Sequence, residues 1–137
     1  MSKTLKISLY TSGEFVFSNK NIIALLNDSC WTIFNNMGKI EILDSKEYEW
    51  INYKNSNANF EDLPIEEAIM FHVYHKDGQI ISMAPESQKL TIWIEVYPKK
   101  IKINQKEFFD YNWYYENIIN EFNKNKIVIE RVQFDEY

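Results

Sequence analysis

The side chains best suited to metal binding or nucleophilic catalysis are few, since Cys30, His72 and His75 are the only cysteine and histidines. On a β-strand, the two imidazoles would point to opposite faces of the sheet, whereas on a helix they would be neighbours. The Asp77-Gly78 pair that follows them favours a strand that ends in a hairpin turn. We therefore expect no metal site and no cofactor, and no spacing around Cys30 indicates a catalytic thiol.

The motifs of phosphate binding and acid–base catalysis are also missing. Gly13, Gly38 and Gly78 are each isolated, so no glycine-rich loop is available to hold a phosphate. Adjacent carboxylates such as Glu66 and Glu67 are typical of a solvated surface. We therefore expect a protein that is not an enzyme, with a catalytic role kept as an open alternative.

Acidic groups outnumber basic ones, because 15 lysines and arginines face 20 aspartates and glutamates, for a net charge of −5. Arg131 is the only arginine. Proteins that bind nucleic acid carry a basic patch, commonly with arginines that contact phosphates and base edges. The composition argues against nucleic-acid binding and favours either a basic protein partner or solubility alone.

Length and hydropathy predict a single domain, residues 1–137, without a membrane anchor. No apolar run approaches the roughly 18 residues that span a bilayer. The first residues lead into a strand pattern and not into an export signal. A lone cysteine fits a reducing compartment, so we expect a cytoplasmic protein.

Residues 90–97 form the clearest strand pattern of the chain. Leucine, isoleucine and valine occupy the even positions, which predicts one dry aliphatic face. The other face carries Thr91, Trp93, Glu95 and Tyr97, so it is either partly covered or used for binding.

Other strands are expected around this one. Residues 5–10 and 15–17 read as a hairpin, and 101–103 as a continuation of the central meander. In a two-residue turn at Asp77-Gly78, His75 would pair with Ile80 and Tyr74 with Ile81. The last strand, 126–134, changes phase near Glu130-Arg131, which predicts a β-bulge. Residues 47–53 fit a helix or a strand equally well, 55–59 read as a polar loop, and 62–67 as a helical turn.

Two helices are expected. The first runs from Asn19 to about Asn36, with Cys30 buried on its apolar stripe. The second opens at residues 104–107 and ends at 123–125. Its apolar stripe holds Phe108, Tyr111, Tyr115, Ile118, Ile119 and Phe122. This order predicts an α+β fold, a single antiparallel sheet built as a meander with hairpins and two main helices packed on one face.

Aromatic residues make up 16% of the chain, more than one core easily buries, and tyrosine and tryptophan are enriched in binding hot spots. Trp113 falls opposite the apolar stripe of the second helix, so we expect it to be exposed, unless the loop before Leu63 covers it. The candidate partner-binding residues are Phe109, Asp110, Trp113, Glu116 and Asn117 on this helix and Trp93, Glu95 and Tyr97 on the central strand.

Acidic and aromatic residues are also interleaved in two segments. In the first, Glu41, Asp44, Glu47 and Glu49 alternate with Tyr48, Trp50 and Tyr53, and in the second, Glu130, Asp135 and Glu136 alternate with Phe134 and Tyr137. Aromatic anchors among negative charges suit a protein partner whose surface is basic.

A compact, acidic, aromatic-rich chain without an active-site motif resembles the immunity proteins of bacterial polymorphic and contact-dependent toxin systems. The richness in asparagine, isoleucine and lysine also resembles an AT-rich bacterial genome. The resemblance implies a protein that binds and blocks one cognate toxin domain, often a basic nuclease. Two other classes stay open: another small interaction module, such as a phage inhibitor or an assembly subunit, and a binder of small molecules or carbohydrates through the Trp93 and Tyr97 face.

Overall fold

The structure, a computed structural model, describes residues 3–26, 29–53 and 68–137. The polar loop expected at 55–59 and the helical turn expected at 62–67 lie outside the described residues. In chain order the elements are β1 (Leu5–Thr11), α1 (Asn19–Leu26), β2 (Trp31–Thr32), β3 (Ile40–Asp44), β4 (Trp50–Tyr53), β5 (Ala68–His75), β6 (Ile80–Glu86), β7 (Lys89–Val96), β8 (Lys100–Ile103), β9 (Lys106–Phe109), α2 (Tyr111–Tyr114), the π-helical turn η3 (Tyr115–Ile119), α3 (Asn120–Lys124) and β10 (Ile129–Glu136).

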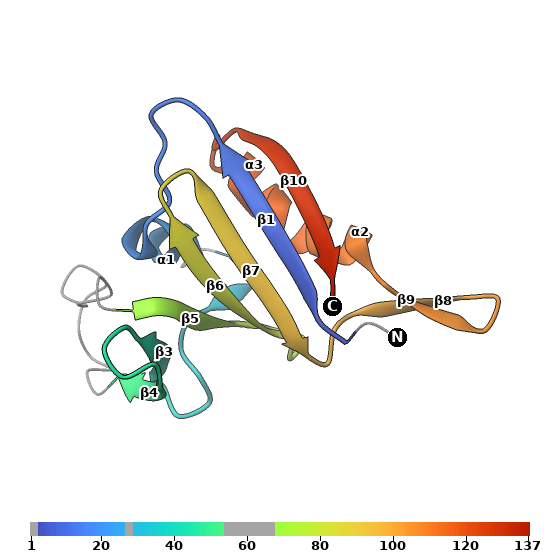
Figure 1. The fold of residues 1–137 in the computed structure, drawn as a ribbon, viewed down its shortest axis with the longest axis horizontal. Helices are drawn as coiled ribbons and strands as arrows, with labels where there is room; N and C mark the ends of the chain where they lie inside the picture. The colour runs from blue at the N-terminus through green and yellow to red at the C-terminus, as the bar shows by residue number, and fades with distance from the viewer. Residues whose placement is uncertain (1–2, 27–28, 54–67) are drawn as a thin grey trace.

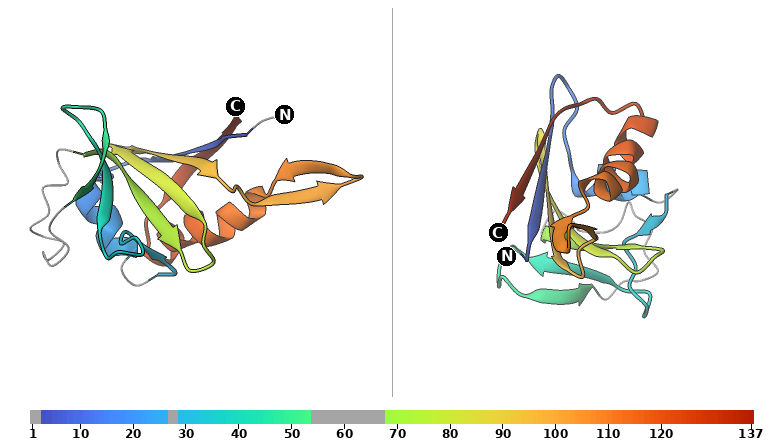
Figure 2. Two further views of the ribbon diagram at one scale, coloured as in Figure 1. Left: turned by 90° about the horizontal axis from the view of Figure 1, so that it is seen from below. Right: turned by 90° about the vertical axis from the view of Figure 1, so that its right-hand side faces the viewer.

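The described strands form one eight-stranded antiparallel sheet and one small hairpin. The order in the sheet is β10-β1-β7-β6-β5-β3-β4, with β2 paired to β5. Strands β8 and β9 pair only with each other and project from the body as an arm (Figure 1). Helix α1 and the continuous α2–η3–α3 helix cover one face of the sheet (Figure 2). This confirms the α+β fold, and we term the opposite side of the sheet the open face.

The core is built on β7 and its neighbour β1, as the alternating pattern predicted. Leu90, Ile92 and Ile94 of β7 are buried and pair directly with buried residues of β1, whereas Val96, the last residue of the predicted dry face, is 44% exposed. Burying one such aliphatic side chain stabilises the fold by about 1.5–3 kcal/mol. The cross-strand pairs are Leu5 with Ile94, Ile7 with Ile92, and Leu9 with Leu90.

The expected hairpin between residues 5–10 and 15–17 is wrong. Strand β1 pairs with β7 on one side and with β10 on the other, so no free edge is left for the segment that follows it. That segment crosses the end of the sheet instead and makes a single bridge, from Phe17 to Ser87. The buried Phe17 ring packs edge-on against Phe122 at 5.7 Å.

The first helix ends at Leu26, ten residues before the predicted end near Asn36. The Ser29 hydroxyl donates to the Leu26 carbonyl and accepts from the Trp31 N–H, local hydrogen bonds that compete with further helix. Trp31 then begins strand β2 beside β5. Cys30 is consequently exposed, not buried on an apolar stripe as predicted.

The second helix also begins later than predicted. Residues 104–107, expected to open it, belong instead to the arm, whose turn residues Asn104 and Gln105 both have positive φ, 51° and 68°. This is the conformation of a tight two-residue hairpin turn. The expected continuation of the central meander at 101–103 is therefore wrong as well. The helix begins at Tyr111, and the Asp110 carboxylate caps it by accepting the Trp113 N–H at 3.1 Å.

The buried face of this helix is centred differently from the predicted stripe. Phe108, Tyr111 and Tyr115 are each 39–46% exposed. In an ordinary α-helix of 3.6 residues per turn, side chains spaced four residues apart move gradually around the helix axis. The π-helical turn at Tyr115–Ile119 has more residues per turn, so it brings side chains at this spacing back onto one face. The side chains aligned on the sheet are Tyr114, Ile118, Ile119 and Phe122.

Two questions left by the sequence are settled near the sheet edges. Within 47–53, Trp50–Tyr53 is strand β4, and the turn before it is closed by the Asp44 carboxylate, which accepts the Glu47 N–H at 3.1 Å. In β10, Thr11 pairs with Ile129 and Tyr10 with Arg131, so the residue between them is extra. The predicted bulge at Glu130-Arg131 is confirmed.

The Asp77-Gly78 turn forms a hairpin, but the predicted register is wrong by one residue. Tyr74 pairs with Ile80 and Val73 with Ile81. The connection has three residues, 76–78, because the His75 N–H donates to the Gln79 carbonyl and only Gly78 has positive φ. This is the three-residue hairpin with a left-handed glycine. The shift keeps Ile81 in the core beside Val73, and it leaves His72 and Tyr74 on the open face.

We predict that replacing Gly78 by valine destabilises the protein by about 1–2 kcal/mol. Gly78 has φ +100°, and a Cβ there would meet no atom within 4 Å, so the cost comes from the backbone conformation and not from a clash. Denaturant unfolding is the measurement. Gly78→Asn is the control and should cost less, since asparagine tolerates positive φ better. Equal stability of both variants and the wild type would show a different turn.

Candidate functional site

The helix patch predicted from the sequence is largely structural. Phe109 is buried and Asp110 is the helix cap, so neither stands free for a partner. Trp113 was expected in water but is half-buried, with its ring 5.1 Å from His75 and 6.1 Å from Trp31. The carbonyl of Asn117 accepts the Trp31 indole N–H at 2.6 Å. Of the predicted set on this helix, Glu116 is fully on the surface.

The second predicted patch does lie on the surface, at the open face and beyond the end of β7. Trp93 is half-buried, with the Lys6 ammonium 5.3 Å from its ring and Tyr137 at 5.9 Å. Glu95 is exposed, and Tyr97 is 90% exposed with φ +46°. The structure thus separates the predicted residues into a packed helix group and an exposed strand group, and their role in binding stays a prediction.

The same helix anchors the arm through Tyr114. The buried Tyr114 hydroxyl donates to Gln79 Oε1 and accepts the Lys99 N–H, both at 2.8 Å. The side-chain amide of Gln79 donates to the Val96 carbonyl at 2.9 Å. Lys99 also pairs with Asp77 at 2.8 Å. These contacts hold the end of β7, the base of the arm and the helix together.

We predict that Tyr114→Phe destabilises the protein by about 1–3 kcal/mol, because it leaves the side-chain oxygen Oε1 of Gln79 and the backbone N–H of Lys99 without their hydrogen-bond partner. Chemical denaturation measures the change. Tyr115→Phe on the same helix is the matched control and should be nearly neutral, since Tyr115 is 44% exposed. A neutral Tyr114→Phe variant would contradict this role for the phenol.

A third surface, which the sequence indicated only as a charge pattern, has the composition of a recognition site. We term residues 40–53, which are β3, β4 and their turn, the acidic hairpin. Three of its large apolar side chains are exposed: Tyr48 by 73%, Trp50 by 43% and Ile51 by 40%. Its charged side chains are Glu41, Asp44, Lys46, Glu47 and Glu49, for a net charge of −3.

Neighbouring strands fix the geometry of this surface. The Trp50 indole lies flat on the His72 imidazole of β5, with ring centroids 3.8 Å apart and planes at 7°. His72 Nδ1 lies 3.0 Å from Ser82 Oγ, and Nε2 lies 3.6 Å from Glu41 Oε2. The Asn35 amide donates to the other oxygen of Glu41 at 2.9 Å. The indole is therefore held in one orientation, and His72 faces away from His75, as predicted for a strand.

Burial decides the charge state at this surface. It lowers the pKa of His72 below its usual 6.5, although the Glu41 and Glu95 carboxylates act in the opposite direction. Burial also raises the pKa of the neighbouring Tyr74 phenol, with a further contribution from Glu41. At neutral pH the imidazole and the phenol are thus uncharged, and the carboxylates, which outnumber Lys46, make the surface negative.

The row of Glu41, His72 and Ser82 has the residue types of a serine hydrolase triad but not its surroundings. The carboxylate is too far from the imidazole for a hydrogen bond, and the indole covers the ring. Ser82 also lies within β6, which is paired on both sides, whereas acyl transfer needs free N–H donors beside the nucleophile. The arrangement positions Trp50 and does not activate Ser82.

Glu41, Trp50, Ile51 and Asn52 line a recess of about 270 Å³ on the acidic hairpin. It combines a carboxylate with an indole, the two groups that together recognise lysine or arginine side chains. The chemistry of this recess therefore suits a basic side chain of a partner.

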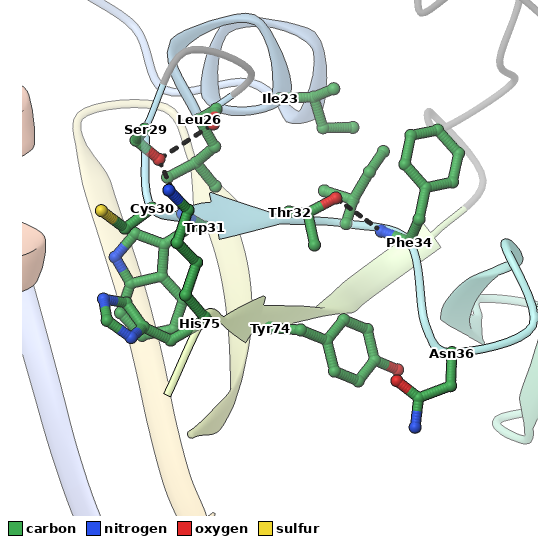
Figure 3. A pocket seen from close by; sticks show the side chains of 12 residues that line it. Ile23, Leu26, Ser29, Cys30, Trp31, Thr32, Phe34, Asn36, Tyr74 and His75 are labelled. Carbon is green, nitrogen blue, oxygen red and sulfur yellow. Dashed lines mark hydrogen bonds between the residues drawn. The ribbon is translucent and has the colours of Figure 1, made fainter. Parts of the chain in front are cut away.

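A separate cavity of about 350 Å³ is lined by residues of α1, of β2 and the residues beside it, and of the end of β5. Figure 3 shows His75 packed against Trp31 and the Tyr74 hydroxyl directed toward Asn36. Ile23 and Leu26 of α1 form an apolar part of its wall. Cys30, which the sequence predicted to be buried, is exposed and also lines this cavity.

We predict that His72 makes the protein less stable as the pH falls below about 6.5, its usual pKa. Because the folded-state pKa is lower, the unfolded chain binds more protons in this window, so the free energy of unfolding falls with pH and levels off below the folded pKa. Melting temperatures across this range measure the effect. In His72→Gln this part of the slope should disappear, and parallel curves for the two proteins would assign it to another group.

No three histidine, cysteine, aspartate or glutamate side chains gather into a metal-binding group among the described residues. Within the same residues, no helix has the length and apolar character needed to cross a membrane. Comparisons with protein-family models, curated proteins and solved structures gave no match.

Proposed function

We propose that this chain is a protein-binding inhibitor that uses the acidic hairpin, and that it acts as a cytoplasmic immunity protein against a cognate toxin domain with a basic surface. The observation that carries the proposal is the fixed, exposed Trp50 beside the Glu41 carboxylate, at the edge of a recess. Hot spots of protein interfaces are enriched in tryptophan and tyrosine held in well-packed positions.

The surrounding charge supports the same partner. Glu47 and Glu49 are exposed beside Tyr48, so a basic surface would meet carboxylates at the rim and aromatic rings at the centre. The net charge of −5 adds long-range attraction to such a partner. A toxin that is not a nuclease fits this chemistry equally well, provided that its contact surface is basic.

A second candidate function rests on the cavity lined by α1, β2 and the end of β5. Its size of about 350 Å³ falls in the range of small-molecule sites. Trp31 and His75 supply aromatic walls, and Tyr74 supplies a buried hydroxyl. A ligand site there would make the protein a small-molecule binder instead of an inhibitor.

The test is binding to the protein encoded by the neighbouring reading frame, because immunity genes lie beside their toxins. We predict that Trp50→Ala weakens binding by about 2 kcal/mol or more, roughly thirtyfold in Kd. Isothermal titration calorimetry measures the affinity. The association rate of the wild type should also fall as added salt screens the encounter.

Tyr97→Ala tests the alternative surface predicted from the sequence, since Tyr97 is an exposed aromatic outside the acidic hairpin. It should bind like the wild type. A loss of affinity in Tyr97→Ala with full affinity in Trp50→Ala would move the binding surface to the strand group predicted from the sequence. Absence of binding by the wild type would contradict the toxin proposal, and thermal melts of each variant separate lost contacts from lost fold.

A further inference from the structure

The arm presents an apolar face that nothing covers among the described residues. Ile101 and Phe108 pair directly across its two strands, and Ile103 is two residues from Ile101, so all three share one face. Ile101 is 42% exposed, Phe108 is 46% exposed and Ile103 is 52% exposed. A two-stranded ribbon alone is marginally stable in water, so such a face gains most from being covered.

The arm also has the opposite charge to the rest of the chain. Within residues 100–109, Lys100, Lys102 and Lys106 face only Glu107, for a net charge of +2. Since the whole chain carries −5, the remaining residues carry −7. Lys106 pairs with Ile103 and so shares the apolar face, whereas Lys100 and Lys102 lie on the other face of the arm. The arm as a whole is basic, so the contact surface that suits its apolar face is apolar with acidic groups beside it.

The acidic hairpin has those properties. It carries a net charge of −3 and exposes Tyr48, Trp50 and Ile51. The arm and the acidic hairpin lie at opposite ends of the molecule (Figures 1 and 2). One molecule is thus unable to bring its own arm onto its own acidic hairpin, but two molecules placed antiparallel would bring each arm onto the hairpin of the other.

The geometry points to a second copy of this chain as the occupant of both surfaces. In a closed pair with two-fold symmetry, the contact between arm and acidic hairpin forms twice, and both apolar faces leave water. Lys106 of each arm then lies among the carboxylates of the opposite hairpin, where Trp50 also offers its ring to a cation, and Lys100 and Lys102 add positive charge from the other face of the arm. The inference does not depend on the toxin proposal, but the two share a surface, so a basic partner would compete with the second copy.

Analytical ultracentrifugation of the purified protein over a concentration series tests the inference. The wild type is expected to form a dimer that weakens as salt is raised. Two charge-reversed variants are made: an arm variant with Lys102→Glu and Lys106→Glu, and a hairpin variant with Glu47→Lys and Glu49→Lys. Each alone pairs like charges and should raise the dimer dissociation constant by roughly tenfold or more.

An equimolar mixture of the two variants is the decisive sample. Every arm then meets a hairpin of opposite charge, so the mixture should regain the dimer that each variant has lost. Lys3→Glu with Lys20→Glu, on other exposed lysines, is the control and should dimerise like the wild type. Circular dichroism melts confirm that each variant is folded.

Three results would overturn the inference: a wild type that is monomeric throughout, variants that dimerise unchanged, or a mixture that stays monomeric. Open-ended growth beyond a dimer would overturn the closed pair as well. A monomeric wild type that still binds its toxin through Trp50 would overturn this inference and leave the proposed function standing.

Discussion

One buried phenol holds together the elements on which the surface of this protein depends. The Tyr114 hydroxyl links the helix to Gln79 at the start of β6 and to the backbone of Lys99 at the base of the arm, and Gln79 in turn holds the last carbonyl of β7. Inside a core, each of these polar groups is costly unless all are paired, so the elements are positioned together or not at all. The direction in which the arm leaves the body is a consequence of this network.

Patterns confined to one strand were predictable from the sequence, whereas pairings between distant segments were not. The alternation in β7 and the phase change at Glu130 were sufficient to predict a strand and a bulge, because both are local consequences of side chains that alternate across a sheet. The expected hairpin after β1 failed because β10, more than a hundred residues away, takes the free edge. The predicted length of the first helix was wrong because the hydrogen bonds of the Ser29 hydroxyl give the backbone an alternative to further helix.

The candidate site shows the same limit. Alternating acids and aromatics around Trp50 indicated a surface for a basic partner, but not that a histidine from β5 would lie beneath the indole, since that contact depends on the order of strands in the sheet. Trp113 was predicted to be exposed because helical periodicity places it opposite the apolar stripe of the helix. It is half-buried because β2 brings Trp31, and the end of β5 brings His75, against that side.

The acidic hairpin has a structural role that is compatible with recognition. Strand β4 is an edge of the sheet, and its exposed Trp50 and Ile51 would favour indiscriminate pairing with other strands. Carboxylates beside such an edge repel most other surfaces of an acidic protein, including the rest of this chain. They attract only a segment that brings lysines together with apolar side chains, whether from a basic partner or from the arm of a second copy. The same charges thus protect the edge from non-specific contact, and under the proposed function they also select the partner that binds there.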